Sequence, residues 1–364
     1  MKKIVISAVN FNEGGPLSIL RDSLKAFQKI YKEQNLDITV LVHKSDLVHE
    51  FCKDFKIIEY PQIKGSWFKR LYFEYYQCKA ISLELSADLW ISMHDISPNV
   101  ACKQVVYCHN PSPFYRLRGN ELFIDPTFYL FCLFYKYLYG INIRKNLFVI
   151  VQQGWLRREF EKRYHVNTIV AYPFETIPSI FIDSSIVKKS KVQFFYPAFP
   201  RVAKNFDILL KATRSLSEIR DDFEVILTID GTENKYAQNL FRRYKDIKCL
   251  KFLGKKTREQ IFELYAQVDC LVFPSNLETW GLPISEFKPF NKPMLLADLD
   301  YAREALGEYG QVKFFNSDNQ VELSNYIGLL IDNNLTFEGN KKILNKQPFF
   351  ENWGSLVKFL STRV

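Results

Sequence analysis

Short apolar runs alternate with longer amphipathic segments along the first half of the chain. The runs have the length and the apolar, β-branched character of buried strands, and they lie at residues 4–9, 37–43, 89–95, 103–110 and 146–151. The segments between them, such as residues 16–27 and 68–85, carry apolar residues at helical spacing. Strands that alternate with helices predict a parallel sheet covered by helices, which is an α/β domain.

The same alternation starts again near residue 174. Predicted strands follow at residues 191–199, 223–231, 247–254, 270–275 and 292–298, with helical patterns such as 205–216 and 258–268 between them. The polar, irregular stretch at residues 178–191 is typical of a hinge. The last residues, 351–364, form an amphipathic pattern with Trp353, Leu356, Val357 and Leu360 on one face. The pattern therefore predicts two α/β domains followed by a terminal helix.

Composition agrees with a globular protein of this size. The 364 residues are 47% hydrophobic and 24% charged, which suffices for two large cores. Seven cysteines without a C-x-x-C pair argue against a disulfide framework or a zinc ribbon, and favour reduced, mostly buried thiols in a cytosolic protein. The first apolar run is too short for a signal peptide, and no run reaches the ~18 apolar residues of a membrane span. The net charge of +9 favours anionic partners, namely phosphates, nucleic acid or an acidic membrane.

The stretch PSNLETWGLPISE, at residues 274–286, places two carboxylates around a turn. It follows the buried run 270–273, and Pro283 has the character of a first helical residue, since its fixed φ suits a helix start. Glu278 then lies on the loop and Glu286 about one turn into the helix. Gly281 allows backbone N–H groups to approach a ligand at the positive end of that helix. The pattern predicts an anion site.

Several motifs, taken in order, resemble the retaining glycosyltransferases of the GT-B fold, family 4. Glu278 to Glu286 looks like the E-x7-E motif of that family, and Gly14-Gly15 matches its glycine loop after the first strand. CHN, at residues 108–110, resembles its strand-end histidine. YPAFPRVAKN, at residues 196–205, resembles the segment that opens its C-terminal domain. The resemblance covers nearly the whole chain.

The resemblance implies an architecture and an activity. The fold would be two facing doubly wound Rossmann-like domains, an acceptor-side domain at 1–173 and a nucleotide-sugar donor domain at 174–347, with a helix at 348–364 packing back on the first. The activity would be retaining transfer of a hexosyl group from a nucleotide-diphosphate sugar to a glycan or polyprenyl-diphosphate-linked acceptor. Such relatives imply bacterial surface-polysaccharide biosynthesis, in the cytoplasm or at the inner face of the cell membrane.

The resemblance also assigns roles to residues. Arg201 and Lys204 would stabilise the leaving diphosphate, although the family more often has a longer gap between them. Glu278 would hold hydroxyls of the donor sugar, Glu286 the ribose diol, and His109 would contact the sugar near C1. The other donor-binding positions that it implies are Gly14, Gly15, Thr279, Trp280, Gly281 and Leu282.

Structural alternatives remain for each of these residues. Arg201 and Lys204 could form a solvated basic turn, Glu278 could be a helix-start carboxylate stabilised by the helix dipole, and His109 could be structural. For the whole chain, the alternatives are a GT-B sugar-nucleotide epimerase or phosphorylase, or a non-catalytic nucleotide-sugar-binding or membrane-associated protein.

No cofactor or metal is expected. Asp298 and Asp300 match the Asp-x-Asp pattern of metal-dependent GT-A enzymes, but they follow a late strand in a chain of the other type, so a surface loop is the better interpretation. The sequence contains no phosphate-binding P-loop, no zinc-protease motif and no motif for nucleic-acid binding.

Residues 111–146 interleave Phe and Tyr with Arg116, Arg118, Lys136, Arg144 and Lys145. Two interpretations stay open for this segment. It could border the acceptor site and dock on an anionic membrane, where aromatic and basic side chains are favourable. Alternatively, residues 128–139 could form a buried helix with a basic edge, since the run is apolar all round.

Overall fold

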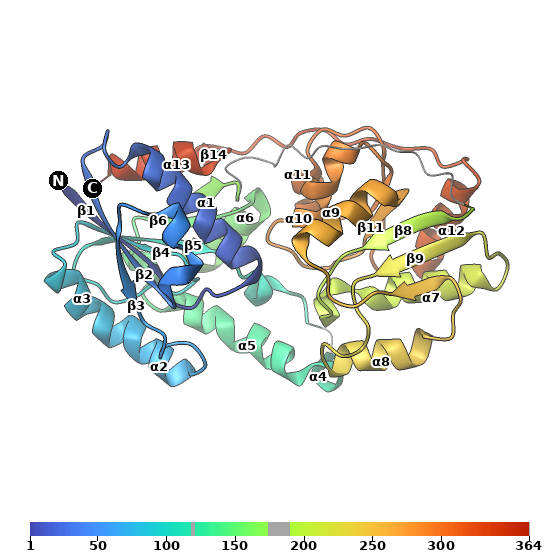
Figure 1. Ribbon diagram of the computed structural model, residues 1–364, viewed down its shortest axis with the longest axis horizontal. Coiled ribbons are helices and arrows are strands. Elements are labelled where there is room, and N and C mark those ends of the chain that lie inside the picture. Colours follow the sequence, from blue (N-terminus) through green and yellow to red (C-terminus); the bar gives the residue numbers. More distant parts are fainter. Residues whose placement is uncertain (118–120, 174–189, 364) are drawn as a thin grey trace. The chain divides into compact units, whose positions relative to one another are not determined.

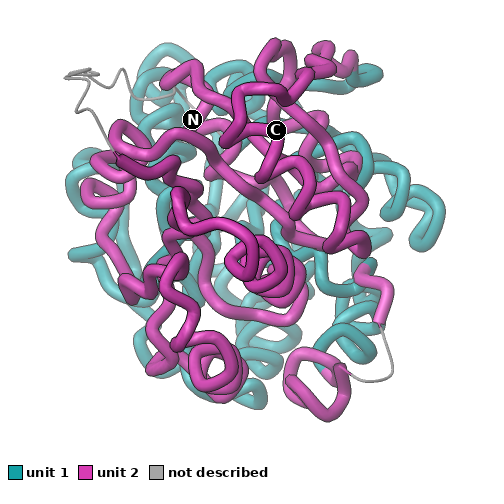
Figure 2. The backbone as a smooth tube through the Cα atoms, turned by 90° about the vertical axis from the view of Figure 1, so that its right-hand side faces the viewer, with its two compact units in different colours: residues 1–114, 131–177, 345–364 teal, residues 115–130, 178–344 magenta. Residues whose placement is uncertain are grey.

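The computed structural model describes residues 1–117, 121–173 and 190–363. The chain divides into two compact units, shown in different colours in Figure 2. Unit 1 consists of Met1–Phe114, Phe131–Ile177 and Asn345–Val364, and unit 2 of Tyr115–Leu130 and Pro178–Leu344. The predicted boundary at residue 174 and nearly all of the predicted hinge lie outside the described residues. Residues 115–130 belong to unit 2, although the sequence pattern had grouped them with the first domain.

Unit 1 is built on a parallel sheet with the strand order β14-β7-β6-β5-β4-β1-β2-β3. The strands are β1 (Lys2–Ala8), β2 (Leu36–Val42), β3 (Lys56–Glu59), β4 (Leu89–Ser92), β5 (Lys103–Cys108), β6 (Phe148–Val151), β7 (Thr168–Ala171) and β14 (Phe349–Phe350). The strand order reverses at β1, which pairs with β2 on one side and β4 on the other. The edge strands β3 and β14 were not predicted, because both are short and incompletely buried.

Helices cover both faces of this sheet (Figure 1). On one face, α1 (Gly14–Ile30) contacts α13 (Trp353–Ser361), and both pack on Ile4 and Ile6 of β1. The four apolar residues of the predicted terminal helix are all buried in this core. The other face is covered by α2 (Trp67–Tyr72), α3 (Cys78–Glu84), α5 (Pro126–Gly140) and α6 (Gly154–Tyr164). A π-helical turn, η3 (Phe73–Gln77), joins α2 to α3.

Unit 2 has a second parallel sheet, with the strand order β10-β9-β8-β11-β12-β13. The strands are β8 (Val192–Tyr196), β9 (Phe223–Leu227), β10 (Leu250–Phe252), β11 (Cys270–Phe273), β12 (Met294–Ala297) and β13 (Val312–Phe315). The helices are α7 (Phe206–Ser217), α8 (Lys235–Tyr244), α9 (Arg258–Gln267), α10 (Leu282–Phe287), α11 (Asp300–Leu306) and α12 (Gln320–Ile331). Here the order reverses between β8 and β11. A short helix, α4 (Glu121–Ile124), also belongs to this unit.

The predicted fold class is confirmed, because both units are doubly wound α/β sheets. In such sheets, ligands bind beyond the carboxyl ends of the strands where the order reverses. The strands on either side of the reversal are β1 and β4 in unit 1, and β8 and β11 in unit 2. All seven cysteines have free thiols, and six of them are buried. A search of the described residues finds no helix with the length and apolar character needed to cross a membrane.

Candidate functional site

Two loops of unit 2 meet where the strand order reverses. One follows β8 and the other follows β11. The backbone N–H of Asn276 donates to the Ala203 carbonyl at 2.8 Å, and the Asn205 side-chain amide donates to the Pro274 carbonyl at 3.2 Å. Asn205 adopts a left-handed backbone with φ 53°, a conformation that asparagine tolerates better than most residues. The two loops are therefore held together by backbone carbonyls.

This junction places two of the predicted site residues in direct contact. Lys204 Nζ lies 2.5 Å from Glu278 Oε1, and the side chains are only 23% and 13% exposed. The Tyr196 hydroxyl, at the end of β8, donates to the Lys204 carbonyl at 2.6 Å and fixes the turn. The sequence predicted that both residues belong to one site, but it did not predict that they pair.

Arg201 has a different environment from Lys204. It is exposed, and its guanidinium lies 5.8 Å from the centroid of the Phe199 ring, which is itself exposed. The loop thus presents one basic residue in an ion pair and a second on the surface.

The turn before α10 is determined by packing as well as by backbone conformation. Gly281 has φ 90°, and a Cβ atom there would lie 3.2 Å from Ile284 Cδ1 and 3.3 Å from the Tyr301 ring. The buried Trp280 indole donates to Ser285 Oγ at 2.8 Å. The Trp280 side chain is therefore part of the core. Thr279 and Leu282, on either side of this turn, are half-buried.

Glu286 lies on α10 and contacts two side chains of α9. Its Oε1 is 3.2 Å from Arg258 Nη2, and the Tyr265 hydroxyl donates to its Oε2 at 3.4 Å. Burial raises the pKa of the Glu286 carboxyl, and the nearby Arg258 charge opposes that shift. α10 begins at Leu282, so Pro283 is its second residue instead of the predicted first. Arg258 and Tyr265 could not be identified from the sequence, because neither lies in a recognisable motif.

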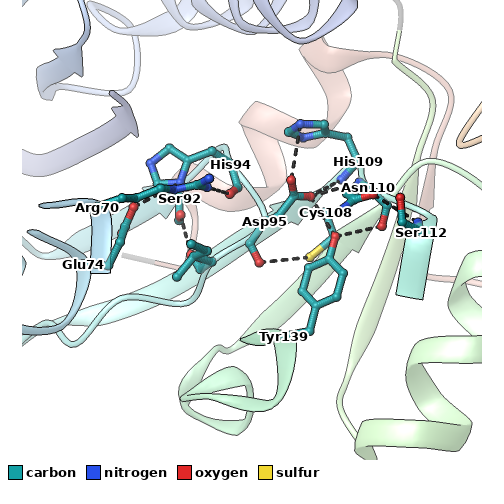
Figure 3. A network of polar contacts seen from close by, with 11 residues as sticks. Arg70, Glu74, Ser92, His94, Asp95, Cys108, His109, Asn110, Ser112 and Tyr139 are labelled. Atoms are coloured by element: carbon teal, nitrogen blue, oxygen red, sulfur yellow. Dashed lines mark hydrogen bonds and ion pairs between the residues drawn. The ribbon is translucent and has the colours of Figure 1, made fainter. Parts of the chain in front are cut away.

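In unit 1, one buried carboxylate organises the loop that carries His109 (Figure 3). Asp95 Oδ1 accepts hydrogen bonds from the His109 N–H at 2.7 Å, the Asn110 N–H at 3.0 Å and the Tyr139 hydroxyl at 2.8 Å. Asp95 Oδ2 lies 3.4 Å from His109 Nε2. Asp95 follows β4 and has an unusual φ of 72°. The conformation of the His109 loop therefore depends on Asp95.

The segment after β1 reaches the same histidine. The Phe11 ring packs edge-on against the His109 ring, with centroids 5.2 Å apart. Gly14 and Gly15 were expected in a loop before the helix, but both are the first residues of α1. Gly14 has φ 70°, which explains why a glycine is favourable there.

A second buried polar cluster lies beside β4 in unit 1 (Figure 3). His94 Nδ1 is 3.3 Å from Glu74 Oε1, and its Nε2 is 3.2 Å from Ser7 Oγ. Arg70 donates to the His94 carbonyl at 2.7 Å. Burial raises the pKa of Glu74 to about 8 and lowers the pKa of His94 well below its usual value.

Neither this cluster nor Asp95 was predicted from the sequence. A signal existed, since the predicted strand at residues 89–95 ends in His94-Asp95, just as the predicted strand at residues 103–110 ends in His109-Asn110. The partners Arg70 and Glu74 could not have been found, because they lie on a predicted helix without a motif.

The Asp-x-Asp pattern is placed on the surface of unit 2. Asp298 is half exposed and forms an ion pair with Arg303 at 2.7 Å, while Asp300 is the first residue of α11. Within the described residues, no group of three or more His, Cys, Asp or Glu side chains is placed to hold a metal ion.

Comparison with known proteins identifies the region that contains the unit 2 site. Residues 177–346 match the family model described as Glycosyl transferases group 1. This part of the chain is a glycosyl transferases group 1 domain. The domain includes the paired Lys204 and Glu278 as well as Glu286, whereas His109 and Asp95 lie outside it.

Known relatives agree with this family. The chain is 23% identical over 213 residues to the O-antigen chain mannosyltransferase RfbU of Salmonella typhimurium. That match covers 56% of this chain and 54% of the relative, so it spans about half of the relative's length.

Solved structures show the same GT-B fold over nearly the full length. The lipopolysaccharide outer core galactosyltransferase WaaB has a TM-score of 0.64 at 12% identity, covering 92% of both chains. Anabaena HepE in complex with UDP has a TM-score of 0.64 at 15% identity, covering 100% of this chain and 95% of the other. The fold predicted from the sequence resemblance is therefore the fold of the protein.

The Glu74 cluster gives a prediction for stability. The folded-state pKa of Glu74 is raised to about 8 from 4.5, so its contribution to stability is fully present below pH 4.5 and is lost as pH rises to 8. His94 has the opposite slope, but only below pH 6.5, because its pKa is lowered. Between pH 6.5 and 8, the free energy of unfolding of the wild type should fall by about 1–2 kcal/mol relative to Glu74→Gln.

Denaturant unfolding of both proteins at the two pH values measures this difference. Glu84→Gln, at an exposed glutamate on the same helical segment, is the matched control and should follow the wild type. Equal pH dependence of the wild type and Glu74→Gln would show that Glu74 is not protonated in the folded protein.

Proposed function

We propose that this protein is a retaining glycosyltransferase. It moves a hexosyl group from a nucleotide-diphosphate sugar to a glycan or a polyprenyl-diphosphate-linked acceptor. The observation that supports this most directly is the Lys204–Glu278 pair, which lies beyond β8 and β11 where the strand order of the group 1 domain reverses. Ligands of doubly wound sheets bind at that position. The E-x7-E spacing of Glu278 and Glu286 supports the retaining class.

The chemistry requires groups of opposite charge at this site. As the bond between C1 and the phosphate oxygen breaks, negative charge grows on the leaving diphosphate. The Lys204 ammonium would stabilise that charge, and fixed charges of this kind contribute most when they are in place before the reaction. Glu278 holds Lys204 in position and would accept hydrogen bonds from sugar hydroxyls. Glu286 would accept the ribose hydroxyls, and His109 would contact the sugar near C1.

The names of the relatives support a role in surface polysaccharide biosynthesis. RfbU is named as a mannosyltransferase of the O-antigen chain, WaaB as a galactosyltransferase of lipopolysaccharide, and one HepE structure holds UDP-glucose. We propose by analogy that the protein acts in the cytoplasm, at the inner face of the membrane, on a growing glycan.

A donor panel tests the proposal. The protein is incubated with UDP-, GDP- and dTDP-hexoses, with and without glycan acceptors, and nucleotide release is measured. Release that depends on the acceptor supports a transferase, and NMR of the product reports whether the anomeric configuration is retained. Interconversion of sugars without acceptor would indicate an epimerase instead. Sugar-nucleotide binding without turnover against any acceptor would indicate a non-catalytic binding protein.

The first functional prediction concerns Glu286. If its carboxylate binds the ribose diol, Glu286→Gln should weaken binding of the matching nucleoside diphosphate by about 1.5–3 kcal/mol, the usual contribution of hydrogen bonds to a charged group. Glutamine preserves the shape next to Arg258 and Tyr265, so folding should be retained. Calorimetric titration measures the affinity, with Glu263→Gln on α9 as the control. Unchanged affinity would remove Glu286 from the donor site.

The second prediction compares Lys204 with Arg201. Lys204→Met should lower kcat by about a hundredfold, because one preorganised charge is lost from the leaving group. Lys204→Arg should recover part of the rate, since it restores the positive charge beside Glu278. Arg201→Met should have a smaller effect, because its side chain lies on the surface. A wild-type kcat in Lys204→Met would show that the diphosphate binds elsewhere.

The third prediction is that turnover does not require a metal ion. With Lys204 assigned to charge neutralisation, the rate should be the same in EDTA and in Mg²⁺ or Mn²⁺. Asp298→Ala, which removes the partner of Arg303, should also leave the rate unchanged. Loss of activity in EDTA that is restored by Mn²⁺ and abolished by Asp298→Ala would assign a metal to the Asp-x-Asp pattern.

A further inference from the structure

Large aromatic side chains face solvent along α2, η3 and α3. Phe68, Tyr72 and Tyr76 follow one another at intervals of four residues, and they are 87%, 57% and 70% exposed. The Tyr72 and Tyr76 rings stack with centroids 5.5 Å apart. Leu83 on α3 is also exposed. A helix that covers a sheet normally has a polar outer face, so this arrangement is unusual for a surface that only meets water.

The helix α5 has the same character. Leu130, Phe134, Tyr137 and Ile141 recur at helical spacing and are all exposed, whereas the opposite side of the helix is buried through Phe128, Cys132, Tyr135 and Tyr139. Of the two interpretations given for residues 128–139, the buried helix therefore holds for one side of α5 only. One side of the helix is core, and the other is an exposed apolar stripe.

The two helical segments lie on the same face of the unit 1 sheet (Figure 1). Trp67, at the start of α2, links them, because its ring centroid is 6.4 Å from that of Phe131 and 6.3 Å from that of Tyr135. Trp67 is itself 47% exposed. We call the exposed residues of the two segments in unit 1 the aromatic strip, and they are Trp67, Phe68, Tyr72, Tyr76, Leu83, Phe134, Tyr137 and Ile141.

The exposed charged residues within the two segments of the aromatic strip are predominantly basic. Within residues 67–84 and 131–146, all of which the structure describes, the exposed charged residues are Lys69, Lys79, Glu84, Arg144 and Lys145. Lys136 is half-buried, and its ammonium lies 5.0 Å from the Tyr137 ring centroid. Two further basic residues of the segment 111–146 are not included here. Arg116 belongs to unit 2, and Arg118 lies outside the described residues.

We propose that the aromatic strip docks on the surface of an anionic lipid bilayer. Tyr and Trp place an apolar ring among the acyl chains and a polar group at the headgroups, while lysines bind the anionic headgroups. A protein partner is less favoured, because lysine is depleted at the cores of protein interfaces. Docking itself does not require the proposed function. Its biological role does rest on the proposed function, since docking would hold unit 1 at the leaflet that presents a lipid-linked acceptor.

Vesicle sedimentation tests the docking without any activity assay. The full-length protein is mixed with vesicles of phosphatidylcholine, with and without phosphatidylglycerol, at low and high salt. Binding should require phosphatidylglycerol and weaken with salt, because screened charges attract less. Trp67 provides a second signal, since its fluorescence should shift to shorter wavelength on binding, and Trp67→Phe should abolish that shift.

Two sets of variants separate the contributions. Replacing Lys69, Lys79 and Lys145 by Ser should weaken binding about a hundredfold, from roughly a fivefold effect for each basic residue near an anionic leaflet. Phe134→Ser with Tyr137→Ser should also reduce binding at least tenfold. The matched controls lie in unit 2. Ile219→Ser with Val321→Ser is the control for the loss of exposed apolar side chains. Replacement of Lys245, Lys248 and Lys255 by Ser is the control for the loss of charge. The controls should bind like the wild type.

Several results would overturn the proposal. The first is that the protein does not bind phosphatidylglycerol vesicles at low salt. The second is that the control variants lose as much vesicle binding as the strip variants. The third is that the strip variants change only self-association, measured by size-exclusion chromatography. The last would make the aromatic strip a contact between copies. The donor panel in solution is independent of these results. Vesicle binding without sugar transfer would contradict the proposed function alone, and transfer without vesicle binding would contradict the docking alone.

Discussion

The geometry of the unit 2 site depends on the junction between the loops that follow β8 and β11. These strands are neighbours in space but are separated in the chain by β9, β10 and three helices. The hydrogen bond from Asn276 to Ala203 joins the loops at the backbone, where it does not depend on side-chain conformation. Because Lys204 and Glu278 lie within two residues of the bonded positions, their ion pair follows from the junction. The tight turn at Gly281 then directs the chain into α10 and Glu286.

In unit 1, the loop that carries His109 is held in place by a side chain instead of by a contact between two loops. There, a side chain holds the loop after β5, since Asp95 accepts two backbone N–H groups and the Tyr139 hydroxyl. Buried carboxylates are costly unless they are hydrogen-bonded, and Asp95 is well supplied with donors. Glu74 is fully buried beside His94, and burial raises its pKa.

Much of this architecture could be predicted from the sequence. Most of the central strands were found because they are continuous apolar runs, although β7 was missed, and α1 was found because Leu17, Leu20, Leu24 and Phe27 mark one buried face. The edge strands β3, β13 and β14 were missed because strands of two to four residues lack a clear pattern. The motif residues of the unit 2 site were identified by spacing and resemblance. Their partners Arg258 and Tyr265, and the support of His109 by Asp95, depend on contacts between distant segments, which no local pattern reveals.

The π-helical turn η3 has a consequence for how this region changes in evolution. A π turn holds one residue more than an α-helical turn, so it corresponds to an inserted residue in a formerly regular helix. Each residue of an α-helix advances the side chains by about 100°, so the insertion changes which residues of α3 face the sheet relative to α2. At the turn itself, Phe73 and Glu74 are buried, while Tyr72 and Tyr76 are exposed. Homologues that lack the turn should therefore be one residue shorter between the equivalents of Tyr72 and Cys78.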